Sequence, residues 1–161
     1  MRFAADAYGS EAALEHPVEV AELVAGAGGD EELQRAAILH DVVEDTDVEL
    51  GEIGAEFGSR VASIVSAMTE DESIDGYLER KKEHRTRACS AGREVALVFV
   101  ADKLSNARRM RRAKKEVDAL KLGHYGATLA TMRAAYPDLP LLAELEQELD
   151  AVSVELQRSP S

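Results

Sequence analysis

The chain has 161 residues, of which 45% are apolar and 31% charged, and this composition favours one folded domain with a real core. Its formal net charge of -12 argues against attraction to nucleic acid or anionic membranes, so we expect neither as a partner. No apolar run reaches the roughly 18 residues of a membrane-spanning helix, and the single Cys89 is typical of a reducing cytoplasm. Aromatic residues make up only 4%, which favours helices over sheets.

The N-terminal third predicts three short helices. The first is expected over residues 2–8. Pro17 is expected to open the second, because proline lacks only an N–H group that is unsatisfied in a first turn anyway. The glycine-rich run 26–29 should end this helix, and Asp30 can cap the third.

The middle of the chain predicts three more helices. Thr46 and Glu49 have the spacing of a capping box, which favours a helix over residues 48–57. A break at glycine and serine then leads into a helix over 60–68, and a highly charged helix is expected over about 74–88.

The C-terminal half begins with the most apolar run of the chain, residues 95–101, which by composition could be a buried strand or a buried helix. We favour one helix over 94–112, because the apolar positions after the run keep the helical period. Two more helices are expected over about 117–135 and 141–156. The sequence thus predicts an all-α protein, with one domain over residues 1–157 and a disordered tail over 158–161.

The segment from His40 to Thr46 places four polar side chains within six residues of an otherwise apolar stretch. In a continuous helix, His40 and Glu44 would be i, i+4 neighbours, and so would Asp41 and Asp45. Burying such a cluster without partners costs several kcal/mol for each charge. A bound metal ion would explain why the sequence tolerates it.

A second polar cluster, Asp102 and Asn106, follows the apolar run directly, and His16 is a third candidate. Together they offer two imidazoles and two carboxylates, a mixed set that suits Mn²⁺ or Fe²⁺ better than a thiolate-selected zinc. Such an ion activates a water molecule and polarises a phosphoryl group. The candidate metal ligands are His16, His40, Asp41 and Asp102.

Three motifs carry a resemblance to a known family: residues 16–21 (HPVEVA), 37–46 (AILHDVVEDT) and 101–106 (ADKLSN). They resemble the HD-domain metal-dependent phosphohydrolases, and more narrowly the hydrolase domain of RelA/SpoT proteins and the small alarmone hydrolases. The resemblance implies an all-α HD-domain helical bundle with one divalent ion, usually manganese. It also implies removal of the 3′-pyrophosphate from ppGpp or pppGpp, a reaction of the stringent response.

The resemblance also implies roles for particular residues. The four candidate ligands would hold the metal, while Glu44 and Asp45 would orient or deprotonate the attacking water. Asn106 would position the substrate, and Lys103 lies in the same motif. A basic helix precedes the third motif in relatives, so the substrate-binding candidates are Asn106, Lys103, Arg80 and Lys81.

Two histidines and a basic run can each be interpreted as structural or as part of a ligand-binding site. His84 can belong to a solvated helix face or to a basic rim that holds phosphates. His124 can serve packing or help to line a ligand pocket. The run 108–115 is interpreted as a phosphate-facing or solvated helix end rather than a nucleic-acid patch, because the whole chain is acidic.

The sequence therefore predicts a cytoplasmic, metal-dependent phosphohydrolase that acts on a nucleotide, with (p)ppGpp as the first candidate. The alternatives are another nucleotide or NADPH phosphatase of the same class, and a nucleotide-sensing module without turnover. The presence of Glu44 and Asp45 favours an enzyme. The oligomeric state is left open.

Overall fold

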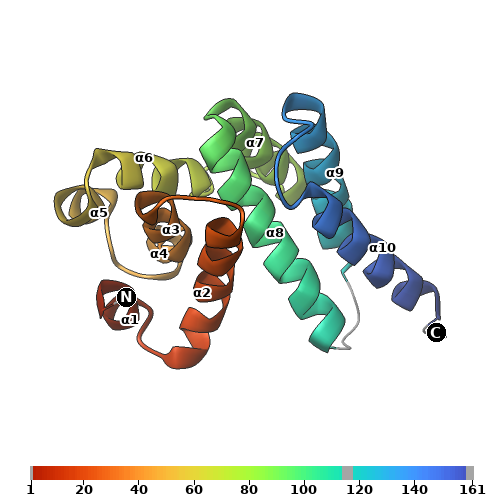
Figure 1. The fold of residues 1–161 in the computed structure, drawn as a ribbon, viewed down its shortest axis with the longest axis horizontal. Helices are drawn as coiled ribbons and strands as arrows, with labels where there is room; N and C mark the ends of the chain where they lie inside the picture. The colour runs from red at the N-terminus through yellow and green to blue at the C-terminus, as the bar shows by residue number, and fades with distance from the viewer. Residues whose placement is uncertain (1, 114–117, 159–161) are drawn as a thin grey trace.

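The computed structural model describes residues 2–113 and 118–158, with side chains described up to residue 154. Every regular element in these ranges is an α-helix, so the predicted all-α fold is confirmed (Figure 1). In chain order the helices are α1 (Arg2–Tyr8), α2 (Glu11–Gly26), α3 (Glu31–Ile38), α4 (Val42–Asp45), α5 (Leu50–Phe57), α6 (Ser59–Met68), α7 (Tyr77–Ser90), α8 (Arg93–Ala113), α9 (Ala119–Ala135) and α10 (Leu142–Arg158).

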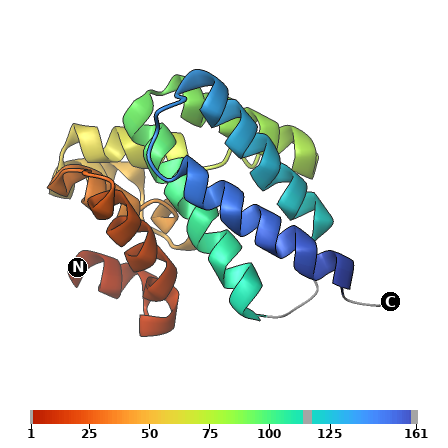
Figure 2. The same cartoon turned by 45° about the vertical axis from the view of Figure 1, so that its right-hand side comes forward.

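Helix α8 is the centre of the bundle. It packs against α2, α3 and α6 on one side and against α7, α9 and α10 on the other, as the two cartoon views show (Figures 1 and 2). Residues 95–101 are all buried. A helix covered on every side needs no polar face, which explains why this run lacks a clear amphipathic pattern. The structure thus decides between strand and helix in favour of the helix.

The start of α2 differs from the prediction. The helix begins at Glu11, where Ser10 caps it by accepting a hydrogen bond from the Ala13 N–H (3.2 Å). Pro17 therefore lies inside the helix and not at its first turn. A proline in this position removes one main-chain hydrogen bond. The cap at Asp30 is as predicted, with its carboxylate accepting from the Leu33 N–H (2.9 Å).

The predicted capping box at Thr46 is wrong. Helix α5 begins at Leu50, and its capping box is formed by Glu49 and Glu52 instead. The Glu49 N–H donates to Glu52 Oε2 (2.9 Å). The Thr46 hydroxyl donates to the carbonyl of Val42 (2.7 Å). Thr46 therefore closes the end of α4 and does not open α5.

Three other boundaries shift. Helix α7 starts at Tyr77 and not near residue 74, because Gly76 has a φ of 89°, outside the helical region. The predicted start of the next helix at 117 lies outside the described residues, and α9 begins at Ala119. Arg158 is the last residue of α10, while the rest of the predicted tail, 159–161, lies outside the described residues.

The basic end of α8 is largely neutralised by neighbouring carboxylates. Arg108 pairs with Glu144 (2.7 Å) and Arg111 with Glu148 (2.8 Å), both on α10. Arg112 pairs with a glutamate of α2 (3.0 Å). For these three arginines the contacts favour the interpretation as a solvated helix end. Arg109 instead lines the cavity described below, and residues 114 and 115 of the basic run lie outside the described residues. None of the described helices has the length and apolar character needed to cross a bilayer.

We expect Leu145→Ala to destabilise the protein by about 2–5 kcal/mol, because Leu145 is fully buried where α10 packs on α8 and its truncation leaves a cavity. The matched control is Leu120→Ala, since the Leu120 side chain is 56% exposed and should cost less than about 0.5 kcal/mol. Urea unfolding of both variants measures the difference. Equal losses would show that α10 is not docked as the structure has it.

Candidate metal centre

His40 and Asp41 lie at a break between two helices. Helix α3 ends at Ile38, and α4 begins only at Val42, so the single continuous helix considered for this segment is wrong. The break forms because the Val42 N–H bonds to the Leu39 carbonyl (3.0 Å), a tighter turn than the α-helical one. The turn directs His40 into the core, where its side chain is fully buried.

The structure brings the four predicted ligand residues together from three separate segments. His16 Nε2 of α2 lies 3.1 Å from Asp102 Oδ1 of α8, and His40 Nε2 lies 3.8 Å from the same oxygen. One ligand atom from each of these three residues lies within 4.8 Å of the others. Asp41 Oδ2 completes the group, 3.1 Å from His40 Nε2 and 4.0 Å from His16 Nε2.

The donor set fits a divalent cation, and His40 shows why. Its Nδ1 lies 2.7 Å from the Ala37 carbonyl, which can only accept, so Nδ1 carries the proton. In a neutral ring, the form that binds a metal, the Nε2 lone pair then faces the cluster, and this buried atom has no hydrogen-bond partner among the described residues. A buried acceptor without a partner costs about 1–3 kcal/mol, which a cation bound at Nε2 would offset.

The electrostatics of the cluster also favour a positive charge there. Burial alone would lower the pKa of His40, yet the adjacent carboxylates of Asp41 and Asp102 raise it well above its ordinary value. Burial would likewise raise the pKa of Asp102, but the Lys103 ammonium and the two imidazoles hold it well below its usual range. The site thus stabilises anionic carboxylates that need a cation beside them.

Asp102 is surrounded by donors from its own helix as well. Asn106, one turn later, donates from Nδ2 to Asp102 Oδ1 (2.6 Å), and Lys103 contacts the other carboxylate oxygen. His16 is oriented from behind by Ser105, whose hydroxyl lies 2.9 Å from His16 Nδ1. These contacts place each side chain before any ion binds.

A cavity of about 510 Å³ opens beside the cluster, and Glu44 and Asp45 line it together with three of the candidate ligands, His16, Asp41 and Asp102. Burial raises the pKa of Glu44 to about 7, an effect that the nearby Asp41 charge adds to. Glu44 Oε1 accepts a hydrogen bond from the Glu70 N–H (2.7 Å), which leaves its second oxygen available to the cavity. Burial and the Asp41 charge also raise the pKa of Asp45.

The predicted substrate-binding residues divide into two groups. Asn106, Lys103 and Lys81 line the cavity. Arg80 does not belong to the lining residues, because its guanidinium turns to Glu70 Oε2 (3.1 Å) and to the Ile74 carbonyl (3.2 Å).

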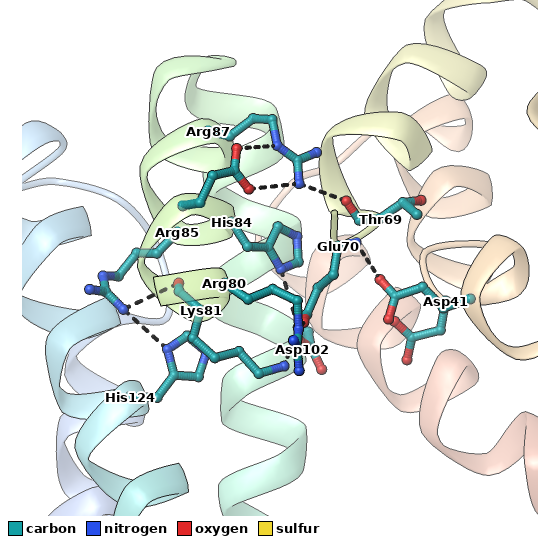
Figure 3. Close-up of polar contacts among 12 residues, drawn as sticks. Asp41, Thr69, Glu70, Arg80, Lys81, His84, Arg85, Arg87, Asp102 and His124 are labelled. Carbon is teal, nitrogen blue, oxygen red and sulfur yellow. Dashed lines mark hydrogen bonds and ion pairs between the residues drawn. The ribbon is translucent and has the colours of Figure 1, made fainter. Parts of the chain in front are cut away.

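Glu70 is the residue that sequence reasoning missed. Its carboxylate contacts Arg80, Lys81 and His84 of α7 (Figure 3). Its N–H donates to the Glu44 carboxylate. Hydrogen bonding to His84 and Lys81 lowers the pKa of Glu70 well below its usual range. The only signal in the sequence is an acidic residue that follows an apolar helix and precedes a basic one.

The chain is similar to a known protein family and to several curated sequences. The HD domain family model matches residues 2–124. A zebrafish protein named guanosine-3′,5′-bis(diphosphate) 3′-pyrophosphohydrolase MESH1 is 38% identical over 105 residues, which is 64% of this chain and 58% of the relative. The human MESH1 protein is 37% identical over the same extent. The chain thus matches less than two thirds of the length of these curated relatives.

Solved structures show the same fold. A crystal structure of a Listeria monocytogenes EGD-e protein aligns with a TM-score of 0.76 and 26% identity, over 89% of this chain and 98% of that one. A second structure, described as a metazoan ortholog of SpoT that hydrolyzes ppGpp, aligns with a TM-score of 0.73 and 25% identity. This alignment covers 96% of this chain and 91% of the other.

Loss of a residue that only orients a metal ligand weakens metal binding by roughly 10- to 100-fold. Because His40 is proposed as a ligand itself, we expect His40→Gln to weaken Mn²⁺ binding by more than this. Isothermal titration of Mn²⁺ into metal-free protein measures the change. The control is His84→Gln, because His84 is also buried but contacts Glu70 instead of the cluster. Equal weakening in both variants would contradict the assignment of His40 as a ligand.

Glu70→Gln should lower the free energy of unfolding in a pH-dependent way. Because the folded-state pKa of Glu70 is depressed, its contribution is fully present above the unfolded value of 4.5 and is lost as the pH falls below it. The gap between wild type and variant should therefore be larger at pH 7 than at pH 3.5 in urea unfolding. A gap that is constant with pH would contradict the Glu70 ion-pair network.

The control for this experiment is Glu56→Gln. Glu56 is exposed and makes no ion pair among the described residues. Its replacement should leave the free energy of unfolding nearly unchanged at both pH values.

Proposed function

The chain belongs to the HD domain family, and on that premise we propose that it hydrolyses the 3′-pyrophosphate of guanosine 3′,5′-bis(diphosphate) with the help of a divalent cation. The names of its sequence relatives and the description of one structural neighbour support this substrate. The observation that carries the proposal is the convergence of His16, His40 and Asp102 on one point beside a cavity.

We propose His16, His40, Asp41 and Asp102 as the metal ligands and Mn²⁺ as the native ion, with Fe²⁺ as the alternative. Two imidazole nitrogens and two carboxylate oxygens suit either ion. When bound, such an ion supplies Lewis-acid activation of water and of a phosphoryl oxygen. Hydrogen bonds to the other ring nitrogen orient the two imidazoles: the Ser105 hydroxyl contacts His16 Nδ1, and the Ala37 carbonyl accepts from His40 Nδ1.

We propose that Glu44 and Asp45 orient the attacking water and accept its proton. A carboxyl group whose pKa lies near 7 exchanges a proton readily at neutral pH, and burial gives Glu44 such a pKa. The Glu70 N–H fixes one Glu44 oxygen and so directs the other. Asp45 lines the same cavity, where it can accept a hydrogen bond from the water or the product.

We propose that Asn106, Lys103 and Lys81 contact the substrate, because all three line the cavity beside the cluster. Arg80 is proposed to act through Glu70, which it shares with Lys81, and to hold the α7 wall of the cavity in place. Cationic side chains on this wall complement the charge of a pyrophosphate group.

We propose one catalytic domain over residues 1–157 that works on free nucleotides in the cytoplasm, as part of the stringent response. The net charge of -12 supports a small nucleotide over nucleic acid as the partner. The cavity itself still offers cationic side chains to such a ligand, namely Lys81, Lys103, Arg109 and Lys121.

Glu44→Gln should lower kcat for Mn²⁺-dependent release of pyrophosphate from ppGpp by about 10²- to 10⁴-fold, because it removes the proton acceptor. Mn²⁺ affinity should be retained, which titration calorimetry checks. Glu56→Gln, on the exposed face of α5, is the matched control and should keep wild-type kcat.

A nucleotide panel that includes NADPH decides between the proposal and its alternatives. Turnover of NADPH or of another nucleotide in place of ppGpp would reassign the substrate within the same class. Binding of ppGpp without turnover in the Mn²⁺-loaded wild type would show a sensing module and overturn the enzymatic proposal.

A further inference from the structure

His124 of α9 is a buried side chain in the wall of the cavity that the mechanism above does not use. Its Nδ1 lies 3.2 Å from a guanidinium nitrogen of Arg85 on α7. Because a guanidinium group can only donate, Nδ1 must accept, and in a neutral ring the proton then sits on Nε2. Burial and the neighbouring Lys103 and Lys81 charges lower the pKa of His124 to about 3, so the ring is neutral at physiological pH.

The Nε2–H group of His124 has no hydrogen-bond partner among the described residues, although the atom is buried. Leaving such a donor unpaired costs about 1–3 kcal/mol. Cationic side chains dominate the charges that act on it: Lys103, Lys81 and Arg85 lower its pKa, whereas Asp102 raises it by less. A donor in a positive environment is suited to an anionic oxygen and unsuited to a metal ion.

His124 lies away from the proposed metal ligands, on the other side of Lys103. The Lys103 ammonium contacts the Asp102 carboxylate, and its Nζ lies 4.4 Å from the centroid of the Phe99 ring. The Phe99 and His124 ring centroids are 6.4 Å apart. In Figure 3, His124 and Arg85 lie at one side of the view and Asp41 at the other, with Asp102 between them.

Resting on the proposed function, we infer that His124 is a substrate-binding residue that donates its Nε2–H to an outer phosphate oxygen of the pyrophosphate group. The phosphorus that is attacked lies at the metal ligands, and the outer phosphate extends along Lys103 toward α9. Arg85 is a positioning residue, because its bond to Nδ1 selects the ring form with the proton on Nε2. The cavity is thus divided into a metal end and an anion-binding end.

The first test compares His124→Leu with His124→Gln in Mn²⁺-dependent hydrolysis of ppGpp. Leucine removes the donor, and KM should rise about tenfold or more, the effect of losing one hydrogen bond to a charged group. Glutamine carries an amide N–H near the position of Nε2 and should recover most of the loss. Arg133→Gln, on the exposed side of the same helix, is the control and should keep the wild-type KM.

The second test does not depend on turnover. In metal-free protein with ¹⁵N-labelled histidine, the four imidazole side chains can be assigned by substitution. The His124 spectrum should show a protonated Nε2 and an unprotonated Nδ1, and inorganic pyrophosphate should shift the Nε2 signal. Arg85→Met should populate the other tautomer and raise KM in the same direction as His124→Leu.

The outcomes separate this inference from the proposed function. If ppGpp is hydrolysed but His124→Leu keeps the wild-type KM, the inference is wrong and the function stands. If ppGpp is not hydrolysed but pyrophosphate shifts the Nε2 signal, the anion-binding end stands and the nucleotide assignment fails. A protonated Nδ1 in the wild type, or an Nε2 signal that pyrophosphate leaves in place, would overturn the inference.

Discussion

Neutralising Asp102, a carboxylate buried in the middle of the central helix, is the constraint on which the rest of the structure depends. Charge inside an apolar core is costly unless partners meet it from several directions. Lys103 and Asn106 supply partners from α8 itself, and the imidazoles of His16 and His40 arrive from α2 and from the turn before α4. The helices pack so that these groups can meet, and the same meeting point forms the candidate metal centre.

The cavity beside this centre is polarised. Its metal end carries Asp41, Glu44 and Asp102, and its α7–α9 end carries Lys81 and the His124 donor, with Lys103 of α8 between the two ends. Glu70 connects the two ends, because its main chain holds Glu44 while its side chain binds the cations of α7. An extended group with a negative charge on each phosphate, such as pyrophosphate, matches this arrangement, with one phosphate for each end.

Helix α8 serves stability and chemistry at once. Its first half is the core of the bundle, and its second half carries the site and then docks α10 through Arg108 and Arg111. A substitution in residues 95–101 would therefore disturb both. Rigid placement of the ligands is the advantage of this design, since a side chain on a buried helix has few alternative positions.

The amino-acid sequence by itself determined the helical class, the position of the long buried helix and the four candidate ligands. These follow from local features: helical periodicity, caps such as Asp30, and polar residues inside apolar runs such as His40. The sequence misplaced the start of α2, because Ser10 rather than Pro17 opens that helix. It also missed Glu70, whose partners lie 10 to 26 residues away along the chain.

Only the tertiary structure decided how distant residues combine. It showed that Arg80 turns to Glu70 while Lys81 faces the cavity, a difference between adjacent residues of one basic run. It also assigned the proton of His124 to Nε2, because Arg85 is brought to the other nitrogen across the contact of α7 with α9. The physical reason is that local propensity determines the helices, whereas the partner of a buried polar group depends on how those helices pack.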